Sequence, residues 1–319
     1  MQRVTRDQIS DTFDQRQPPV LRVSSGETCV VETEDSRKGR TRTQGTTTAE
    51  FLRAMRARGY YGNPINGPIY VEEAEPGDTL AVTIDSMACD TLGYLGYWPD
   101  QYHMQDIVPE PVTELVEIRD GCVHYDLQTS QGTHHVRLPT QPMIGTIGTA
   151  PKMEVLLSGK TGRHGGNLDS SEIGPGATVY LPVSVPGAYL YLGDCHPRQG
   201  DGEVSGFEMR SEVTLTPSVL KNWTANQQWI RVETSTHLVT IGADRPLESA
   251  QWLCIREMMR WLEERYALSP RESRIMITLC GDLRPGQAMS GLYTMRYRMP
   301  KEHLPAQQAG QLDIRSNDV

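Results

Sequence analysis

Residues able to bind a metal ion or move protons gather in two glycine-rich segments. The first, GRHGGNLD, begins at Gly162, and the second, GDCHPRQGDGEVSGFE, begins at Gly193. Imidazole nitrogen and carboxylate oxygen are the ligands that hard and borderline metal ions take in proteins. Glycine lets a backbone turn sharply and approach a ligand closely. The two segments therefore predict one metal site, formed where two loops meet.

The second segment holds two pairs of polar residues spaced by two. Asp194 and His196 would point to the same side of an extended strand, so we expect His196 to be a metal ligand. Asp194 is then a second ligand or the carboxylate that orients the imidazole. Asp201 and Glu203 repeat the spacing between glycines, although QGDGE is also ordinary turn composition. Cys195 lacks an evident activating base, so we expect it to be a bystander.

The first segment offers ligands and hydrogen-bond donors together. His164 and Asp169 are candidate ligands, and an exposed loop residue is an equally good interpretation of His164. The Asn167 amide could donate a hydrogen bond to an oxyanion, as could the backbone N–H groups of Gly165 and Gly166.

The two segments also resemble the signature blocks of the acetamidase/formamidase family of amide hydrolases. The matching stretches are RHGGNLD and LGDCHPRQGDGEVSG, and three further blocks keep the family order: NPINGPIYVEEAEPGDTLAV from Asn63, PMIGTIGTAP from Pro142 and GDLRPGQAM from Gly281. The resemblance implies hydrolysis of a small, formamide-like or acetamide-like carboxamide to carboxylate and ammonia by metal-activated water. It implies zinc as the metal, with Ca²⁺ or Mg²⁺ as alternatives, and a homodimer or higher homo-oligomer.

The resemblance also assigns roles to residues. Glu203 becomes a ligand or general base, Asp201 its alternate, and Asn63 a residue near the substrate, although a turn asparagine is the more ordinary interpretation of Asn63. The implied metal ligands are His164, Asp169, Asp194, His196 and Glu203. The implied catalytic residues are Glu203, Asp201 and Asn167, and the implied substrate-binding residues are Asn63, Gly165, Gly166, Tyr97 and Trp98.

One stretch departs from the family pattern. Family members often carry His-x-x-Trp near the N-terminus, where this chain has Ser10-Asp11-Thr12-Phe13. If that histidine binds metal in relatives, it is lost here or replaced, with Asp11 as the candidate. The departure keeps open an altered substrate, a different metal, or a catalytically silent binding protein of the same fold.

Aromatic residues are concentrated in the segment from Asp90 to Pro111, which includes Tyr97 and Trp98. Aromatic side chains in such a segment cover the edge of a core or form the wall of a pocket. As a pocket wall they would suit a larger or cyclic amide, which is a second hypothesis for the substrate.

The composition excludes several classes of partner. A formal net charge of −9 argues against nucleic acid and anionic membranes, and favours a neutral or cationic substrate. No apolar stretch approaches the ~20 residues of a membrane span, and the first residues lack the apolar core of a signal peptide. We therefore expect a cytoplasmic protein.

The elements that position the site are predicted to be strands. Alternating apolar residues and proline-glycine turns dominate from residue 68 to residue 216, which indicates a β-sandwich-like body over residues 1–209 that carries the site. Residues 210–319 read as a smaller α+β lobe. Its expected helices follow Pro246 and the capping box at Ser269, and another helix is expected near Phe51. Residues 35–48, rich in Arg, Ser, Thr and Gly, predict an exposed loop.

Overall fold

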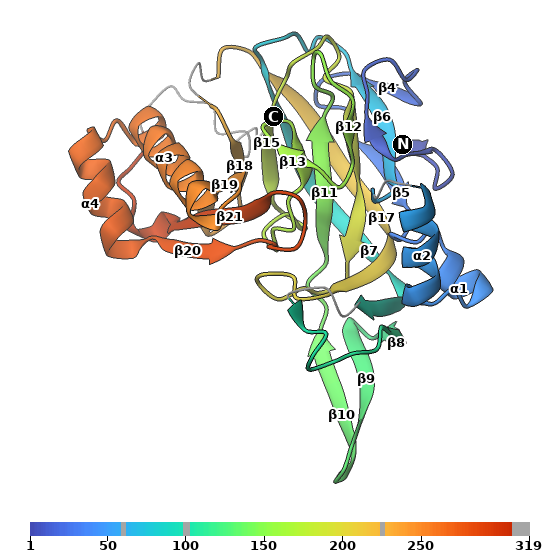
Figure 1. The fold of residues 1–319 in the computed structure, drawn as a ribbon. Coiled ribbons are helices and arrows are strands. Elements are labelled where there is room, and N and C mark those ends of the chain that lie inside the picture. Colours follow the sequence, from blue (N-terminus) through green and yellow to red (C-terminus); the bar gives the residue numbers. More distant parts are fainter. Residues whose placement is uncertain (59–61, 98–102, 224–226, 308–319) are drawn as a thin grey trace.

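The computed structural model describes residues 1–58, 62–97, 103–223 and 227–307. Most of the chain forms a β-rich body, and the C-terminal helices form a lobe at one side of it (Figure 1). Among the described residues, 19 strands join one curled sheet, and a further two strands pair with each other. The predicted mainly β fold with an α+β C-terminal lobe is confirmed.

The strands of the body run from the N-terminus to residue 220. They are β1 Gln2–Val4, β2 Ile9–Ser10, β3 Thr12–Phe13, β4 Leu21–Val23, β5 Cys29–Thr33, β6 Ile65–Val71, β7 Thr79–Tyr97, β8 Val112–Arg119, β9 Cys122–Thr129, β10 Gly132–Pro139, β11 Met143–Thr149, β12 Leu156–Leu157, β13 Thr161–Gly162, β14 Gly165–Asn167, β15 Thr178–Pro182, β16 Leu190–His196 and β17 Gly206–Leu220. Their inward-facing valine, isoleucine and leucine side chains form the main core.

The C-terminal lobe packs two helices against a small part of the sheet. Its elements are β18 Ile230–Glu233, β19 His237–Asp244, α3 Leu247–Tyr266, α4 Pro270–Cys280, β20 Asp282–Pro285, β21 Tyr293–Pro300 and a 3₁₀ turn at Lys301–His303. Buried residues of α3, including Trp261 and Met258, pack with Met299 of β21 in a second core. The predicted boundary at residue 209 falls inside β17, and the two-domain division stays a prediction. None of the described helices is long and apolar enough to span a membrane.

Local sequence signals account for the helices. α4 begins at the predicted capping box, in which the Ser269 hydroxyl accepts a hydrogen bond from the Glu272 N–H. α2, Thr48–Arg58, occupies the position predicted around Phe51.

The prediction of an exposed loop at residues 35–48 is wrong for its first part, whereas residues 43–45 and 47 are exposed. Residues 40–44 form α1, Arg40–Gln44, and most residues from Asp35 to Thr41 are buried. The Asp35 carboxylate accepts hydrogen bonds from the backbone N–H groups of Arg37 and Gly39, which closes a tight turn. This turn directs the Arg37 side chain inward, so polar composition was no guide to exposure here.

The two glycine-rich segments meet through β11. This strand pairs with β14 on one side and with β16 on the other, so GGN lies one strand away from the strand that carries Asp194 and His196. A Cβ at Gly166, which has a φ of 100°, would overlap the carbonyl oxygen of Lys160. Glycine therefore allows the close backbone approach on which the first loop depends.

Replacing Gly166 by alanine should lower the free energy of unfolding by about 2–5 kcal/mol, because left-handed strain adds to an overlap with backbone. The matched control is Gly77→Ala, at a φ of 98° with no atom within 4 Å of an added Cβ. Strain alone should cost it about 1–2 kcal/mol. Urea unfolding measures both variants, and equal losses would contradict the argument from close approach.

Candidate active site and metal centre

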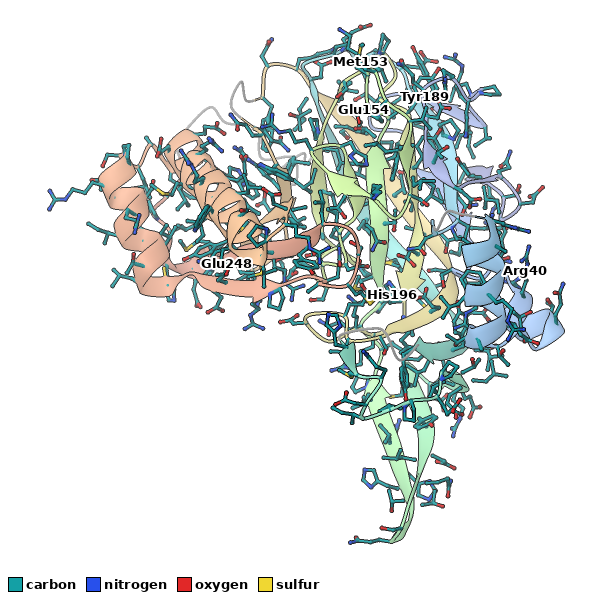
Figure 2. The ribbon with its side chains drawn as sticks, viewed as in Figure 1. Arg40, Met153, Glu154, Tyr189, His196 and Glu248 are labelled. Atoms are coloured by element: carbon teal, nitrogen blue, oxygen red, sulfur yellow. The ribbon has the colours of Figure 1, made fainter. Side chains whose placement is uncertain are left out.

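Four carboxylates and one imidazole converge inside the body. They form two overlapping groups, Asp169 with His196 and Glu203, and Asp194 with His196 and Glu208. In each group the candidate ligand atoms lie within 4.8 Å of one another, and all five side chains are buried. Figure 2 shows His196 within the β-rich body, away from the exposed Met153 at its end. The structure therefore brings together four of the five predicted metal ligands.

Three of the residues that carry these carboxylates have a left-handed backbone conformation. Asp169, which follows β14, has a φ of 50°, Asp194 of β16 has a φ of 58°, and Glu203 in the following loop has a φ of 44°. A left-handed residue other than glycine costs about 1–2 kcal/mol. Such strain clusters at functional sites, where the surrounding structure holds it in place.

His196 presents one ring nitrogen to the carboxylates. Its Nδ1 lies 2.9 Å from the carbonyl oxygen of Phe207 and donates to it. Its Nε2 lies 3.7 Å from Asp169 Oδ1 and 4.0 Å from Asp194 Oδ1, which is too far for a hydrogen bond. The Phe207 carbonyl therefore holds the Nδ1 proton, so that in the neutral imidazole the Nε2 lone pair faces the cluster, as in histidines that bind metals.

Burial of so much negative charge shifts the pKa values of Asp194, Glu203, Glu208 and His196. Desolvation, followed by repulsion from neighbouring carboxylates, raises the pKa of Asp194 and of Glu203 well above their ordinary values. The pKa of Glu208 is also raised, mainly by burial. Burial opposes a charge on His196, but Glu208, Asp169 and Asp194 together raise its pKa to about 10. Without a cation, the cluster must hold protons to remain buried.

A divalent cation fits the donor set. Buried polar atoms in proteins nearly always have hydrogen-bond partners. Among the described residues, four buried atoms of the cluster have none: Asp169 Oδ1, His196 Nε2, Glu203 Oε2 and Glu208 Oε2. One imidazole nitrogen with several carboxylate oxygens suits zinc, and the excess of oxygen also admits harder ions.

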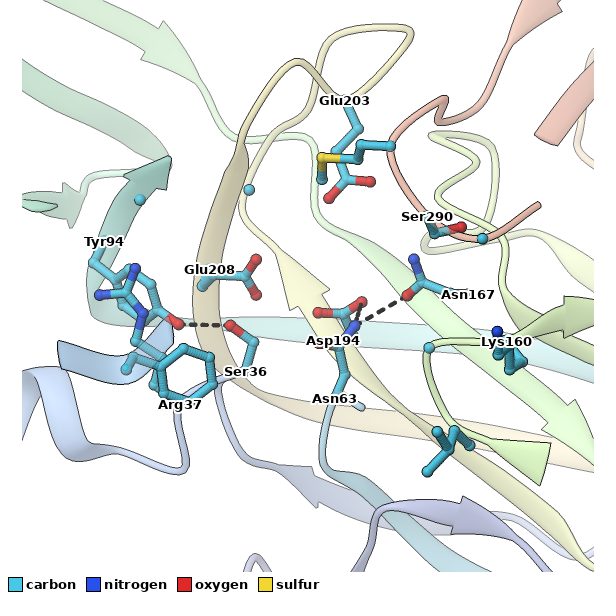
Figure 3. A pocket seen from close by; sticks show the side chains of 17 residues that line it. Ser36, Arg37, Asn63, Tyr94, Lys160, Asn167, Asp194, Glu203, Glu208 and Ser290 are labelled. Atoms are coloured by element: carbon cyan, nitrogen blue, oxygen red, sulfur yellow. Dashed lines mark hydrogen bonds between the residues drawn. The ribbon is translucent and has the colours of Figure 1, made fainter. Parts of the chain in front are cut away.

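Amide and hydroxyl groups hold two of the carboxylates. The Asn63 Nδ2 donates to Asp194 Oδ2 at 2.5 Å and to Asn167 Oδ1 at 3.0 Å (Figure 3). The Thr146 hydroxyl lies 3.1 Å from the same Asp194 oxygen and 2.7 Å from Asn167 Oδ1. Asn167 Nδ2 in turn donates to Asp169. These contacts orient Asp194 and Asp169 as outer partners orient metal ligands.

A cavity of about 400 Å³ opens beside the cluster. Asp194, Glu203 and Glu208 contribute to its lining, together with Asn63 and Asn167 (Figure 3). The remaining walls come from residues far apart in the sequence: Ser36, Arg37, Phe51, Tyr94, Gly96, Leu157, Gly159, Lys160, Gly206, Met289, Ser290 and Gly291.

Several predicted site residues lie elsewhere. The His164 ring packs edge-on against Phe13, with centroids 4.8 Å apart, and burial lowers its pKa to about 4. Asp201 forms ion pairs with Arg284 and Arg296 instead of joining the cluster. Neither His164 nor Asp201 contributes to the grouped ligand atoms of the described residues.

The other predicted residues differ in their positions. Gly165 and Gly166 sit in strand pairing with β11 and do not line the cavity. Tyr97 ends β7, and alternation along that strand turns Tyr94, not Tyr97, toward the cavity. Trp98 lies outside the described residues.

Cys195 is buried beside Thr33, and burial raises the pKa of its thiol to about 12. A thiol held in its protonated form is a poor nucleophile. This environment supports the prediction that Cys195 is a bystander.

Glu208 was missed by the sequence reasoning. It is a single carboxylate between Phe207 and Met209 at the start of β17, all three of them buried. A charged residue within an apolar strand is costly to bury unless it is paired or binds a ligand, and this signal could have identified it.

Without bound metal, Glu203→Gln should stabilise the protein at pH 8 more than at pH 5. The folded state raises the pKa of Glu203, so its contribution to stability is full below the ordinary value of 4.5 and is lost as pH rises through the folded value. Thermal melts in EDTA at both pH values measure the difference. A pH-independent effect would contradict the buried, repelled carboxylate.

Comparison with known proteins places the chain in a family. The sequence profile of the acetamidase/formamidase family matches residues 3–163 and 157–237. The chain is 25% identical over 215 residues to the formamidase of Methylophilus methylotrophus, a match covering 50% of this chain and 52% of that protein. The chain thus spans about half the length of the curated relatives it matches.

Solved structures agree over nearly the whole chain. The acetamidase of Bacillus halodurans is 33% identical with a TM-score of 0.83, covering 93% of this chain and 97% of that one. The acetamidase of Yersinia enterocolitica is 27% identical with a TM-score of 0.83, covering 96% and 93%. The match of the family profile over most of residues 3–237, with these structural likenesses, shows that the chain belongs to the acetamidase/formamidase family.

Proposed function

We propose that this protein is a metal-dependent amidase that hydrolyses a carboxamide to a carboxylate and ammonia. The observation that carries the proposal is the buried cluster of four carboxylates and His196 beside a cavity of about 400 Å³. Membership of the acetamidase/formamidase family supports the same reaction class.

The metal ion would be held by His196 Nε2 and by carboxylate oxygens of the two groups. Asp169, Asp194 and Glu208 would supply the oxygens, and Glu203 completes the first group as a further ligand or as the general base. A bound divalent ion supplies Lewis-acid chemistry, lowering the pKa of water from ~15.7 towards ~7 and polarising a carbonyl. Zinc is the proposed ion, with Ca²⁺ and Mg²⁺ as alternatives.

Glu203 is proposed as the group that moves the proton. It lines the cavity, and its Oε2 has no hydrogen-bond partner among the described residues. Glu203 would take a proton from water as the water oxygen bonds to the amide carbon. It would then pass that proton to the nitrogen, so that ammonia leaves as the C–N bond breaks. A carboxylate whose environment favours the protonated form is suited to this exchange.

Asn63, Asn167 and Thr146 are proposed as positioning residues. Their hydrogen bonds fix Asp194 and Asp169, so the carboxylates need not reorganise when substrate binds. Asn167 also lines the cavity, and the second N–H of its amide would make the predicted contact with a developing oxyanion.

Within the described residues, the position of Asp11 does not support it as a replacement for the absent N-terminal histidine. The Asp11 carboxylate pairs with Lys38 Nζ at 2.9 Å, and Asp11 belongs to neither ligand group. The cluster is assembled from other elements, so the altered N-terminal stretch does not by itself argue for a silent binding protein. The expected cytoplasmic location and homo-oligomeric state remain predictions.

Metal analysis and ammonia release test the function together. Purified protein should contain a divalent metal and should release ammonia from formamide, acetamide or a larger amide in a series. Glu203→Gln should lower kcat by about 10²–10⁴-fold, because proton transfer is lost, while the melting curve stays cooperative. Absence of both metal and turnover over the whole series would favour the silent binding protein.

A comparison of Glu203→Gln with Asp201→Asn separates the two predicted bases. Asp201 is tied to Arg296 and Arg284 and does not line the cavity, so the larger loss of kcat should follow the change at Glu203. The reverse order, measured with the same amide at saturating concentration, would transfer the role to Asp201.

A further inference from the structure

Arg37 is a buried cation in the wall of the cavity. Arg37 is 4% exposed, and its guanidinium lies over the Tyr94 ring, 4.3 Å from the ring centroid. Its two terminal nitrogens donate to the hydroxyls of Thr41, at 3.0 Å, and Thr48, at 2.6 Å.

No carboxylate of the described residues forms an ion pair with Arg37, although Arg37 is near enough to Glu208 to oppose the rise of its pKa. Its basic neighbours differ in this respect, since Lys38 pairs with Asp11 at 2.9 Å and Arg42 pairs with Asp90 at 2.8 Å. A buried charge is normally paired, because losing its hydration is costly. A guanidinium has five N–H groups, and the two threonine hydroxyls accept from only two of them.

The surroundings keep the guanidinium in place. A Cβ at Gly96 would overlap a terminal nitrogen of Arg37 and lie 3.0 Å from Thr48 Oγ1, so only glycine leaves room there. Ser36 and Tyr94 are joined by a hydrogen bond of 2.6 Å in the same wall (Figure 3). Planar, stacked arginine is the side chain best suited to bind a carboxylate through two hydrogen bonds.

The cavity is also larger than formamide or acetamide requires. Its volume is about 400 Å³, whereas a water molecule occupies about 30 Å³ of liquid and acetamide has only four heavy atoms. Pockets for larger ligands begin at about 300 Å³. Phe51 and Tyr94, whose rings lie beside the Arg37 guanidinium, add apolar surface to the lining.

We propose that Arg37 selects amides whose acyl group ends in a carboxylate. The substrate class is then the monoamide of a short dicarboxylic acid, with its amide at the cluster and its carboxylate at Arg37. This inference rests on the proposed amidase function and specifies its substrate. It departs from the neutral or cationic substrate that the net charge favours, because the charge of one wall differs from that of the whole molecule.

The test compares substrates that differ in charge and not in size. Malonamate, succinamate and glutaramate each have a diamide with the same number of heavy atoms. In the wild type, kcat/KM for the best monoamide should exceed that of its diamide by about tenfold or more, as expected for hydrogen bonds to a charged group. Arg37→Gln should remove this preference, and Arg37→Lys should keep part of it.

Arg42→Gln is the matched control, because Arg42 already has a carboxylate partner and does not line the cavity. It should retain the wild-type preference for the monoamide. Lys160→Gln tests the other cation of the cavity lining, and loss of the preference there instead would overturn the assignment to Arg37. Equal loss of monoamide and diamide hydrolysis in Arg37→Gln would also overturn it, since Arg37 would then only balance the charge of the cluster.

Binding separates failure of this inference from failure of the proposed function. Isothermal titration of the purified protein with succinate and glutarate should show binding to the wild type and to Arg37→Lys, and a loss of about tenfold or more in Arg37→Gln. If no amide is hydrolysed but this pattern holds, the amidase function fails and the carboxylate site stands. If amides are hydrolysed and neither diacid binds nor monoamides are preferred, the inference fails alone. Cooperative melting of each variant checks that it folds.

Discussion

The structure depends on how one cluster of buried negative charge is compensated. Asp169, Asp194, Glu203 and Glu208 share the interior with a single imidazole, His196. Isolated carboxylates cannot stay ionised in such a place, so protons or a cation must accompany them. The raised pKa values of Glu203, Asp194 and Glu208 show that protons can compensate the charge. The buried ligand atoms without hydrogen-bond partners among the described residues fit a cation instead. In the proposed chemistry, Glu203 takes up and releases a proton beside the bound cation.

The body of the protein supplies the geometry of that cluster. Strand pairing through β11 brings the two glycine-rich segments together, and left-handed backbone at Asp169, Asp194 and Glu203 turns three carboxylates toward one another. Each of these conformations costs about 1–2 kcal/mol. Burial of the continuous apolar core of the sheet offsets this cost. The sheet thereby holds together carboxylates that repel one another.

Local signals in the sequence predicted much of the fold and part of the site. Helices α3 and α4 follow from apolar spacing and from the capping box at Ser269, which depend on residues a few positions apart. Asp194, His196 and Glu203 were predicted because their spacing and glycine neighbours are also local. His164 was not separable from them by type, and only the packing of its ring on Phe13 distinguishes it.

Glu208 and Arg37 were not predicted as site residues, because their positions depend on contacts between distant parts of the chain. Glu208 reaches the cluster because β17 pairs with β16 and β7. Arg37 lies in a segment of polar composition, and it is buried because a turn at Asp35 directs it toward the Tyr94 ring. Net charge and composition average over the whole chain, so neither indicates the local charge of a cavity wall.

Titration of the metal-free protein with Zn²⁺ in buffers of different ionisation enthalpy tests the central claim most directly. The cluster holds protons when it lacks a cation, so binding should occur with release of protons at pH 7. His196→Ala, which removes the nitrogen shared by both ligand groups, should weaken that binding by at least about tenfold. Binding without proton release, or unchanged binding in the variant, would contradict the assignment of the cluster as the metal site.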